Sequence, residues 1–152
     1  MLIVWREQMS VDSGLIDEDH RSLIGIINEF AAAEVGPQAV PALARILTKL
    51  DHYTKTHFER EEGLQRAVDY SFRDAHRNAH KDLIRQLSEL RARLKAEFAA
   101  KNADEIRAIH AGMADFLHHW LIDHIIETDL RMKPYTKDMR THARKLSGRL
   151  GE

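Results

Sequence analysis

Two pairs of polar side chains, each with members four residues apart, lie near the middle of the sequence. The first pair is His57 with Glu61, and the second pair is His76 with His80. In an α-helix, residues four apart share one face about one turn from each other, so each pair directs two potential metal ligands toward one point. Two such pairs on the facing helices of a hairpin would form half of a metal site.

The composition limits what such a site can hold. The 152 residues include ten histidines and no cysteine, so any metal must be bound by nitrogen and oxygen atoms, and disulfides are excluded. A chain without cysteine suits a reducing cytosol, and we expect a cytoplasmic protein. The net charge is −1, with both signs mixed along the chain, which gives no reason to expect nucleic acid or an anionic membrane as a partner. No segment approaches the roughly 20 apolar residues of a transmembrane helix.

The spacing of apolar residues in steps of three and four predicts four helices. We expect the first helix to run from about Asp17 to Gly36-Pro37 and the second from near Pro41 to about Val68. The third should run from a capping box of Ser71 and Asp74 to a turn at residues 101–104, and the fourth from that turn to Pro134. Short turns between four helices favour an all-α, up-down-up-down four-helix bundle. We expect one domain over residues 1–152, with an N-terminal arm (1–16), the bundle (17–133) and a short amphipathic C-terminal tail (134–152).

This topology brings polar groups from all four helices to one end of the bundle. The start of the first helix, the end of the second, the start of the third and the end of the fourth lie together in such a bundle. At about 1.5 Å per residue, the inward polar residues all fall within roughly 15 Å of that end. They are His20, His57, Glu61, His76, His80, His124 and Asp129.

Five imidazoles and two carboxylates are too many for one zinc ion, which usually takes four ligands. Two metal ions that share the carboxylates would use all seven groups. Mixed imidazole and carboxylate ligands suit iron, and helix bundles are known to hold di-iron sites between facing helices. The ligand types also allow manganese or zinc.

The sequence resembles the hemerythrin family, in its bacterial form, over about residues 5 to 133. The resemblance rests on LIDEDH with His20, HFEREE with His57 and Glu61, HRNAH with His76 and His80, and HWLIDHIIETD with His124 and Asp129. It implies two iron ions per chain, one held by His76, His80 and His124 and the other by His20 and His57. Glu61 and Asp129 would bridge them together with an oxo or hydroxo group, and the second iron would keep an open position for dioxygen.

The resemblance also places an oxygen pocket around Phe58, Trp120, Leu121 and Ile125, which are bulky and apolar. A dry pocket without a free acid favours reversible oxygen binding over cleavage of the O–O bond. We therefore expect an oxygen-binding protein for storage, delivery or buffering, and not an enzyme. The alternatives are an oxygen or redox sensor that acts through a protein partner, docked on the C-terminal tail, and an enzyme that acts on peroxide or nitric oxide.

One spacing does not fit a regular helix. His124 and Asp129 are five residues apart, about 140° of helix rotation, so an ideal helix would not direct both at one metal pair. We expect a π-type turn or a loosened final turn between them. The remaining histidines lie off the apolar seams or outside the motifs, and we interpret them as surface residues: His52, His110, His118, His119 and His142.

Overall fold

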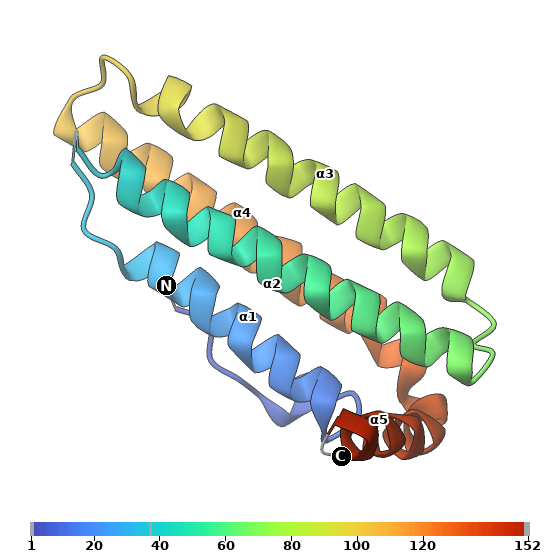
Figure 1. The fold of residues 1–152 in the computed structure, drawn as a ribbon. Coiled ribbons are helices and arrows are strands. Elements are labelled where there is room, and N and C mark those ends of the chain that lie inside the picture. Colours follow the sequence, from blue (N-terminus) through green and yellow to red (C-terminus); the bar gives the residue numbers. More distant parts are fainter. Residues whose placement is uncertain (1, 37, 151–152) are drawn as a thin grey trace.

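The computed structural model describes residues 2–36 and 38–150. Four long helices form the bundle: α1 (Leu15–Ala32), α2 (Val40–Ala67), α3 (Arg73–Phe98) and α4 (Ala103–Glu127). They run alternately up and down (Figure 1), and the described residues contain no strand. The predicted all-α, up-down-up-down four-helix bundle is therefore confirmed.

No helix within the described ranges combines the length and the apolar character needed to span a lipid bilayer.

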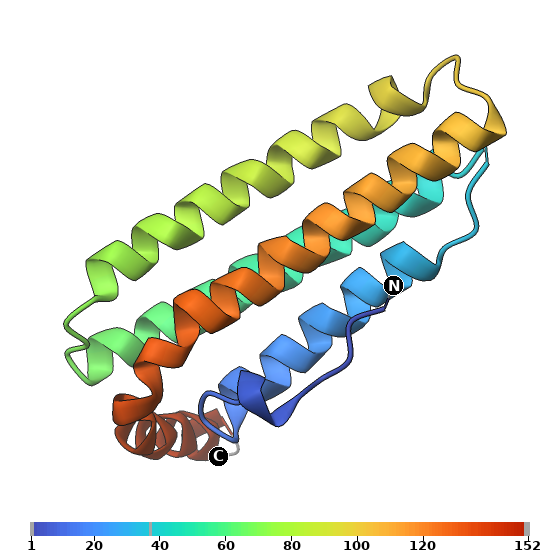
Figure 2. The ribbon, with the colours of Figure 1, turned by 180° about the vertical axis from the view of Figure 1, so that it is seen from behind.

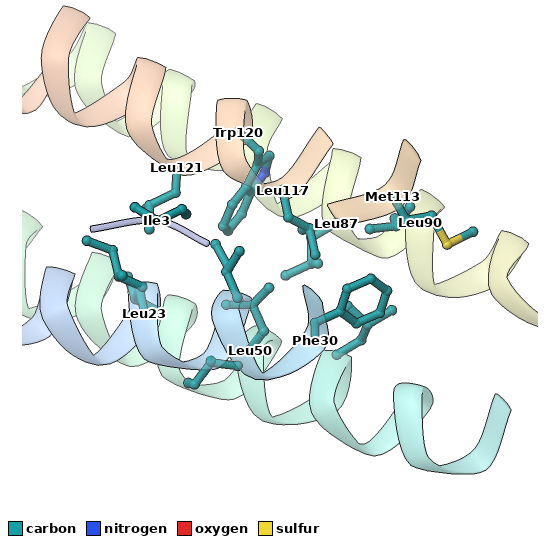
Figure 3. Packing of buried hydrophobic residues seen from close by; sticks show 14 of the residues in the cluster. Ile3, Leu23, Phe30, Leu50, Leu87, Leu90, Met113, Leu117, Trp120 and Leu121 are labelled. Carbon is teal, nitrogen blue, oxygen red and sulfur yellow. The ribbon is translucent and has the colours of Figure 1, made fainter. Parts of the chain in front are cut away.

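Apolar side chains at helical spacing fill the centre of the bundle. On α2, Leu43, Leu47 and Leu50 are almost completely buried, as their steps of three and four require. Figure 3 shows Leu50 of α2 and Leu117 of α4 pointing into the same interior. A smaller apolar cluster closes the end of the bundle where α2 ends; it consists of Val11, Ile16, Leu64, Tyr70, Met132 and Met139.

The predicted end of the first helix and the predicted start of the third are wrong. The first helix ends at Ala32, before Gly36, and Pro37 lies outside the described residues. The third begins at Arg73 without a side-chain cap, so Ser71 does not open it. The reason lies in the preceding turn, where Asp69 has a positive φ of 53° and the Tyr70 amide donates to the Gln65 carbonyl. This turn ends α2 and places Ser71 before the helix, where its hydroxyl lies 3.5 Å from that of Tyr135.

The α-helical part of α4 ends earlier than predicted. Pro134 does not terminate it, because α4 ends at Glu127 and Pro134 lies inside the following 3-10 helix, η2 (Asp129–Tyr135). The last bond of the α-helical type runs from the Thr128 amide to the His124 carbonyl, and the Arg131 amide then donates to the Thr128 carbonyl. The predicted loosening between His124 and Asp129 is thus confirmed, as a change from α to 3-10 geometry.

Both ends of the chain pack against the bundle. The N-terminal arm, with a short 3-10 helix η1 (Glu7–Met9), runs back along α1 (Figure 2), and residue 1 lies outside the described residues. The predicted helical tail is α5 (Thr136–Leu150), which crosses the end of the bundle, and residues 151–152 lie outside the described residues. Met139 of α5 is fully buried there, and the Arg140 guanidinium donates to the Asp12 carbonyl at 2.7 Å.

One side chain holds the arm through two hydrogen bonds. The Ile3 amide donates to Asn28 Oδ1 at 2.7 Å, and Asn28 Nδ2 donates to the Ile3 carbonyl at 2.8 Å.

We expect Asn28→Ala to lower the free energy of unfolding by about 1–3 kcal/mol, because both backbone groups of Ile3 lose a partly buried partner. Urea denaturation would measure this. Asn78→Ala, at an exposed position of α3, is the control and should change stability little; equal effects of the two changes would contradict this role of Asn28.

Candidate metal centre

The structure places all seven sequence-predicted polar residues at one end of the bundle. Four helices and η2 each contribute: α1 carries His20, α2 carries His57 and Glu61, α3 carries His76 and His80, α4 carries His124, and η2 begins with Asp129. All seven are buried, and the least buried is His124, at 9% exposure. Ionisable side chains are rarely buried together at this density unless they are paired or bind a metal.

The seven side chains divide into two groups that share both carboxylates. One group is Glu61, His76, His80, His124 and Asp129, and the other is His20, His57, Glu61 and Asp129. Within each group the potential ligand atoms lie within 4.8 Å of one another. The division gives two sets of potential metal ligands, one with three imidazoles and the other with two.

Glu61 divides its two oxygens between the two groups. Its Oε2 atom lies 3.0 Å from His57 Nε2, whereas Oε1 lies 2.7 Å from His76 Nε2 and 3.2 Å from His80 Nε2. Asp129 does the same from the opposite side, since Oδ2 faces His20 Nε2 at 3.1 Å while Oδ1 faces the imidazoles of the other group. A carboxylate that presents one oxygen to each of two sites has the arrangement of a bridging ligand.

The short contacts inside the centre are not hydrogen bonds. The Nε2 atoms of all five histidines and all four carboxylate oxygens are buried without a partner of suitable geometry among the described residues. Buried polar atoms nearly always have such partners, so a cluster of nine unpartnered atoms at one place needs another explanation. Ring nitrogens and carboxylate oxygens that converge without bonding to one another fit one or more metal ions as their common partner.

The carboxylates and imidazoles strongly influence each other's protonation. Burial alone would lower the pKa of His57, but Glu61 and Asp19 outweigh it and raise this pKa to about 10. Burial likewise opposes protonation of His76, whose pKa is raised to about 9 by Asp129 and Glu61. Burial would raise the pKa of Glu61, yet the adjacent imidazoles hold it well below its usual value. A metal ion that binds here must displace protons from the imidazoles, so metal binding should release protons.

Two further carboxylates orient the histidines, and the sequence analysis missed both. Asp19 Oδ2 lies 2.9 Å from His57 Nδ1 and is itself held by Arg60, while Glu62 Oε2 lies 3.1 Å from His80 Nδ1. Metal-binding histidines usually donate their second ring N–H to such a group, which fixes the ring. Adjacency in the sequence was the available signal, because Asp19 precedes His20 and Glu62 follows Glu61.

The four apolar residues predicted to line an oxygen pocket are all buried. Phe58 stacks on His80 with ring centroids 3.7 Å apart, and Ile125 is fully buried. Trp120 uses its indole N–H to donate to the Leu83 carbonyl at 3.0 Å. Trp120 and Leu121 point from α4 toward the interior that they share with Leu23 (Figure 3).

One histidine outside the centre was predicted wrongly. His110 is not a surface residue: it is buried, and its Nε2 atom lies 2.7 Å from the Phe30 carbonyl. His52 and His119 are exposed as predicted, whereas His118 and His142 are half-buried.

Comparison with known proteins agrees with this geometry. The family profile described as the hemerythrin HHE cation binding domain matches residues 12–136. The chain belongs to the hemerythrin family. Its relatives include the bacteriohemerythrin of Pseudomonas aeruginosa, 31% identical over 84% of this chain and 76% of the relative, and myohemerythrin-1 of Phascolopsis gouldii, 30% identical over 86% and 91%.

Further hemerythrins support the same assignment. The bacteriohemerythrin of Stenotrophomonas maltophilia is 28% identical over 93% of this chain and 84% of its own length. A crystal structure of wild-type hemerythrin superposes with a TM-score of 0.71 at 22% identity, covering 88% of this chain and 97% of that one. At that identity the structure supports the shared fold, and the family assignment rests on the profile and the sequence relatives.

Loss of an orienting carboxylate should weaken metal binding. We expect Asp19→Asn to reduce the affinity for ferrous iron about 10- to 100-fold, because the His57 ring loses its charged partner. Competition with a chromogenic chelator would measure the affinity. Glu59→Gln, which also replaces a carboxylate by an amide but at an exposed position of α2, two residues after His57, is the control. If both variants retain the affinity of the unmodified chain, Asp19 has no such role.

Proposed function

We propose that the centre holds two iron ions and binds dioxygen reversibly. In this proposal His76, His80 and His124 would hold one iron, His20 and His57 would hold the other, and Glu61 and Asp129 would be shared by both along with an oxo or hydroxo group. The observation that carries the proposal is the division of each carboxylate's oxygens between the two groups of imidazoles. Membership in the hemerythrin family supports iron as the metal.

The unequal number of ligands assigns different roles to the two positions. One group supplies five protein ligands and the other supplies four, with the carboxylates counted in both. In this proposal the position next to His20 and His57 would keep an open site for dioxygen, because it has one protein ligand fewer. When bound, a di-iron pair supplies the electrons that allow dioxygen to bind there reversibly.

The surrounding side chains favour binding over further reaction. Phe58, Leu121 and Ile125 are buried and exclude water, and none of them carries a proton donor. The one N–H group among the predicted pocket residues, that of Trp120, is already bonded to the Leu83 carbonyl. Without an acid that delivers protons, cleavage of the O–O bond is disfavoured, which supports a carrier or buffer over an enzyme.

Oxygen sensing is a second candidate, favoured by the connection between the centre and the tail. Asp129 is the first residue of η2, and η2 leads directly into α5. A change in how Asp129 is held would therefore act on the element that places α5 across the end of the bundle. A protein partner that reads the position of α5 would turn this into a signal.

The direct test is to load the protein with ferrous iron under anaerobic conditions, count the iron, and follow the absorption spectrum through cycles of oxygen and argon. We expect two iron atoms per chain and an oxygen-dependent charge-transfer band that disappears when oxygen is removed. One iron per chain, or irreversible oxidation in the first cycle, would contradict reversible binding at a di-iron centre.

Replacement of a pocket residue should expose the oxygenated centre to water. We expect Leu121→Ala to speed autoxidation about tenfold or more, because truncation opens space for water beside the centre. The decay of the oxygen-dependent band measures this rate. Leu94→Ala is a similar truncation at a buried position near the end of α3, whereas His76 and His80 lie near its start, so it controls for lost stability. Equal autoxidation rates in the two variants would argue against a protective pocket.

A further inference from the structure

The residues one helical turn from the histidines, toward the middle of the bundle, form a layer above the centre. Positions three or four residues from a centre histidine lie about one turn away on each helix. Six of the side chains at these positions are apolar: Leu23, Ile24, Leu83, Ile84, Trp120 and Leu121. On α2 the corresponding inward position, three residues before His57, carries a hydroxyl group, that of Thr54.

The hydroxyl of Thr54 is buried and has no partner among the described residues. Thr54 has 0% exposure, and its Oγ1 atom makes no hydrogen bond. Two other threonines of α2 behave differently: Thr48 donates to the Ala44 carbonyl at 2.9 Å, and Thr56 donates to the His52 carbonyl at 3.0 Å. Bonding to the carbonyl four residues earlier is the usual solution for a threonine inside a helix. Thr54 does not use it, although burial makes an unpaired hydroxyl costly.

Thr54 shares its helix with His57, which belongs to the group with the proposed open position. It stands on the same helix as His57, one turn away, and the neighbouring turn on its other side carries the fully buried Leu50. The polar group of Trp120 in this layer is already bonded. Among the described side chains of the layer, the Thr54 hydroxyl is thus the one free polar group.

We propose that Thr54 donates a hydrogen bond to the small ligand held at the open position beside His57. This rests on the proposed di-iron function and adds a ligand-contacting residue that the apolar description of the pocket omits. The chemical class is a small dioxygen-derived or anionic ligand with a lone pair directed into the pocket. A hydroxyl donates a hydrogen bond without giving up its proton at neutral pH, so Thr54 stabilises the ligand without promoting cleavage of the O–O bond.

Three substitutions separate this role from a structural one. Thr54→Val preserves the shape of the side chain and removes the hydroxyl, whereas Thr54→Ser retains the hydroxyl. Thr56→Val makes the same isosteric change at an exposed position of the same helix and is the matched control. Each variant is measured in two forms: stability to urea without iron, and affinity for azide together with the rate of dioxygen release after loading with iron.

We expect Thr54→Val to be at least as stable as the unmodified chain without iron, because it removes a hydroxyl that has no partner. After iron loading, it should bind azide about three- to tenfold more weakly and release dioxygen faster by a similar factor, the size of one lost hydrogen bond. Thr54→Ser should remain closer to the unmodified protein, and Thr56→Val should not differ from it in ligand binding.

Two results would overturn the inference. Unchanged azide affinity and dioxygen release in Thr54→Val would show that the hydroxyl does not contact the ligand. Loss of stability without iron, with ligand binding unchanged, would assign it a structural role. Failure of the proposed function itself is distinguishable, because the unmodified protein would then release no dioxygen, whereas azide binding would still report on the hydroxyl.

Discussion

The structure depends on the burial of two carboxylates and five imidazoles at one end of a narrow helical bundle. Ionised groups in such a place are costly unless a compensating charge lies among them. The carboxylate oxygens approach the ring nitrogens to about 3 Å without forming hydrogen bonds, so protein atoms alone do not satisfy them. Cations located between the nitrogens and the oxygens would supply both the charge and the missing partners.

This requirement explains the irregular end of the chain. Asp129 cannot face the same interior as His124 if the α-helix continues, so α4 ends at Glu127 and a 3-10 segment follows. That segment turns the chain across the bundle and leads into α5. Met132 and Met139, both fully buried, then cover the end of the bundle together with Tyr70. The closing element of the fold is thus a consequence of how one carboxylate is positioned.

The sequence predicted the helices and the convergence of the centre because both depend on the regular geometry of a helix. The prediction failed where two local signals compete for the start of a helix. It also failed where a residue's role depends on contacts with a distant helix. The turn at Asp69 overrode the capping signal of Ser71. The interpretation of His110 as a surface residue overlooked its position four residues after Ile106 and three before Met113, and its partner, the Phe30 carbonyl, lies 80 residues away on α1. Asp19 was missed because its role depends on His57, 38 residues away.

The most direct test of the central claim is the position of the metal, measured by anomalous diffraction at the iron edge from crystals of the iron-loaded protein. We expect two peaks per chain inside the bundle, one within about 2.2 Å of His76, His80 and His124 nitrogens and the other within the same distance of His20 and His57. A single peak, or peaks that lie only at exposed histidines such as His119, would contradict the account.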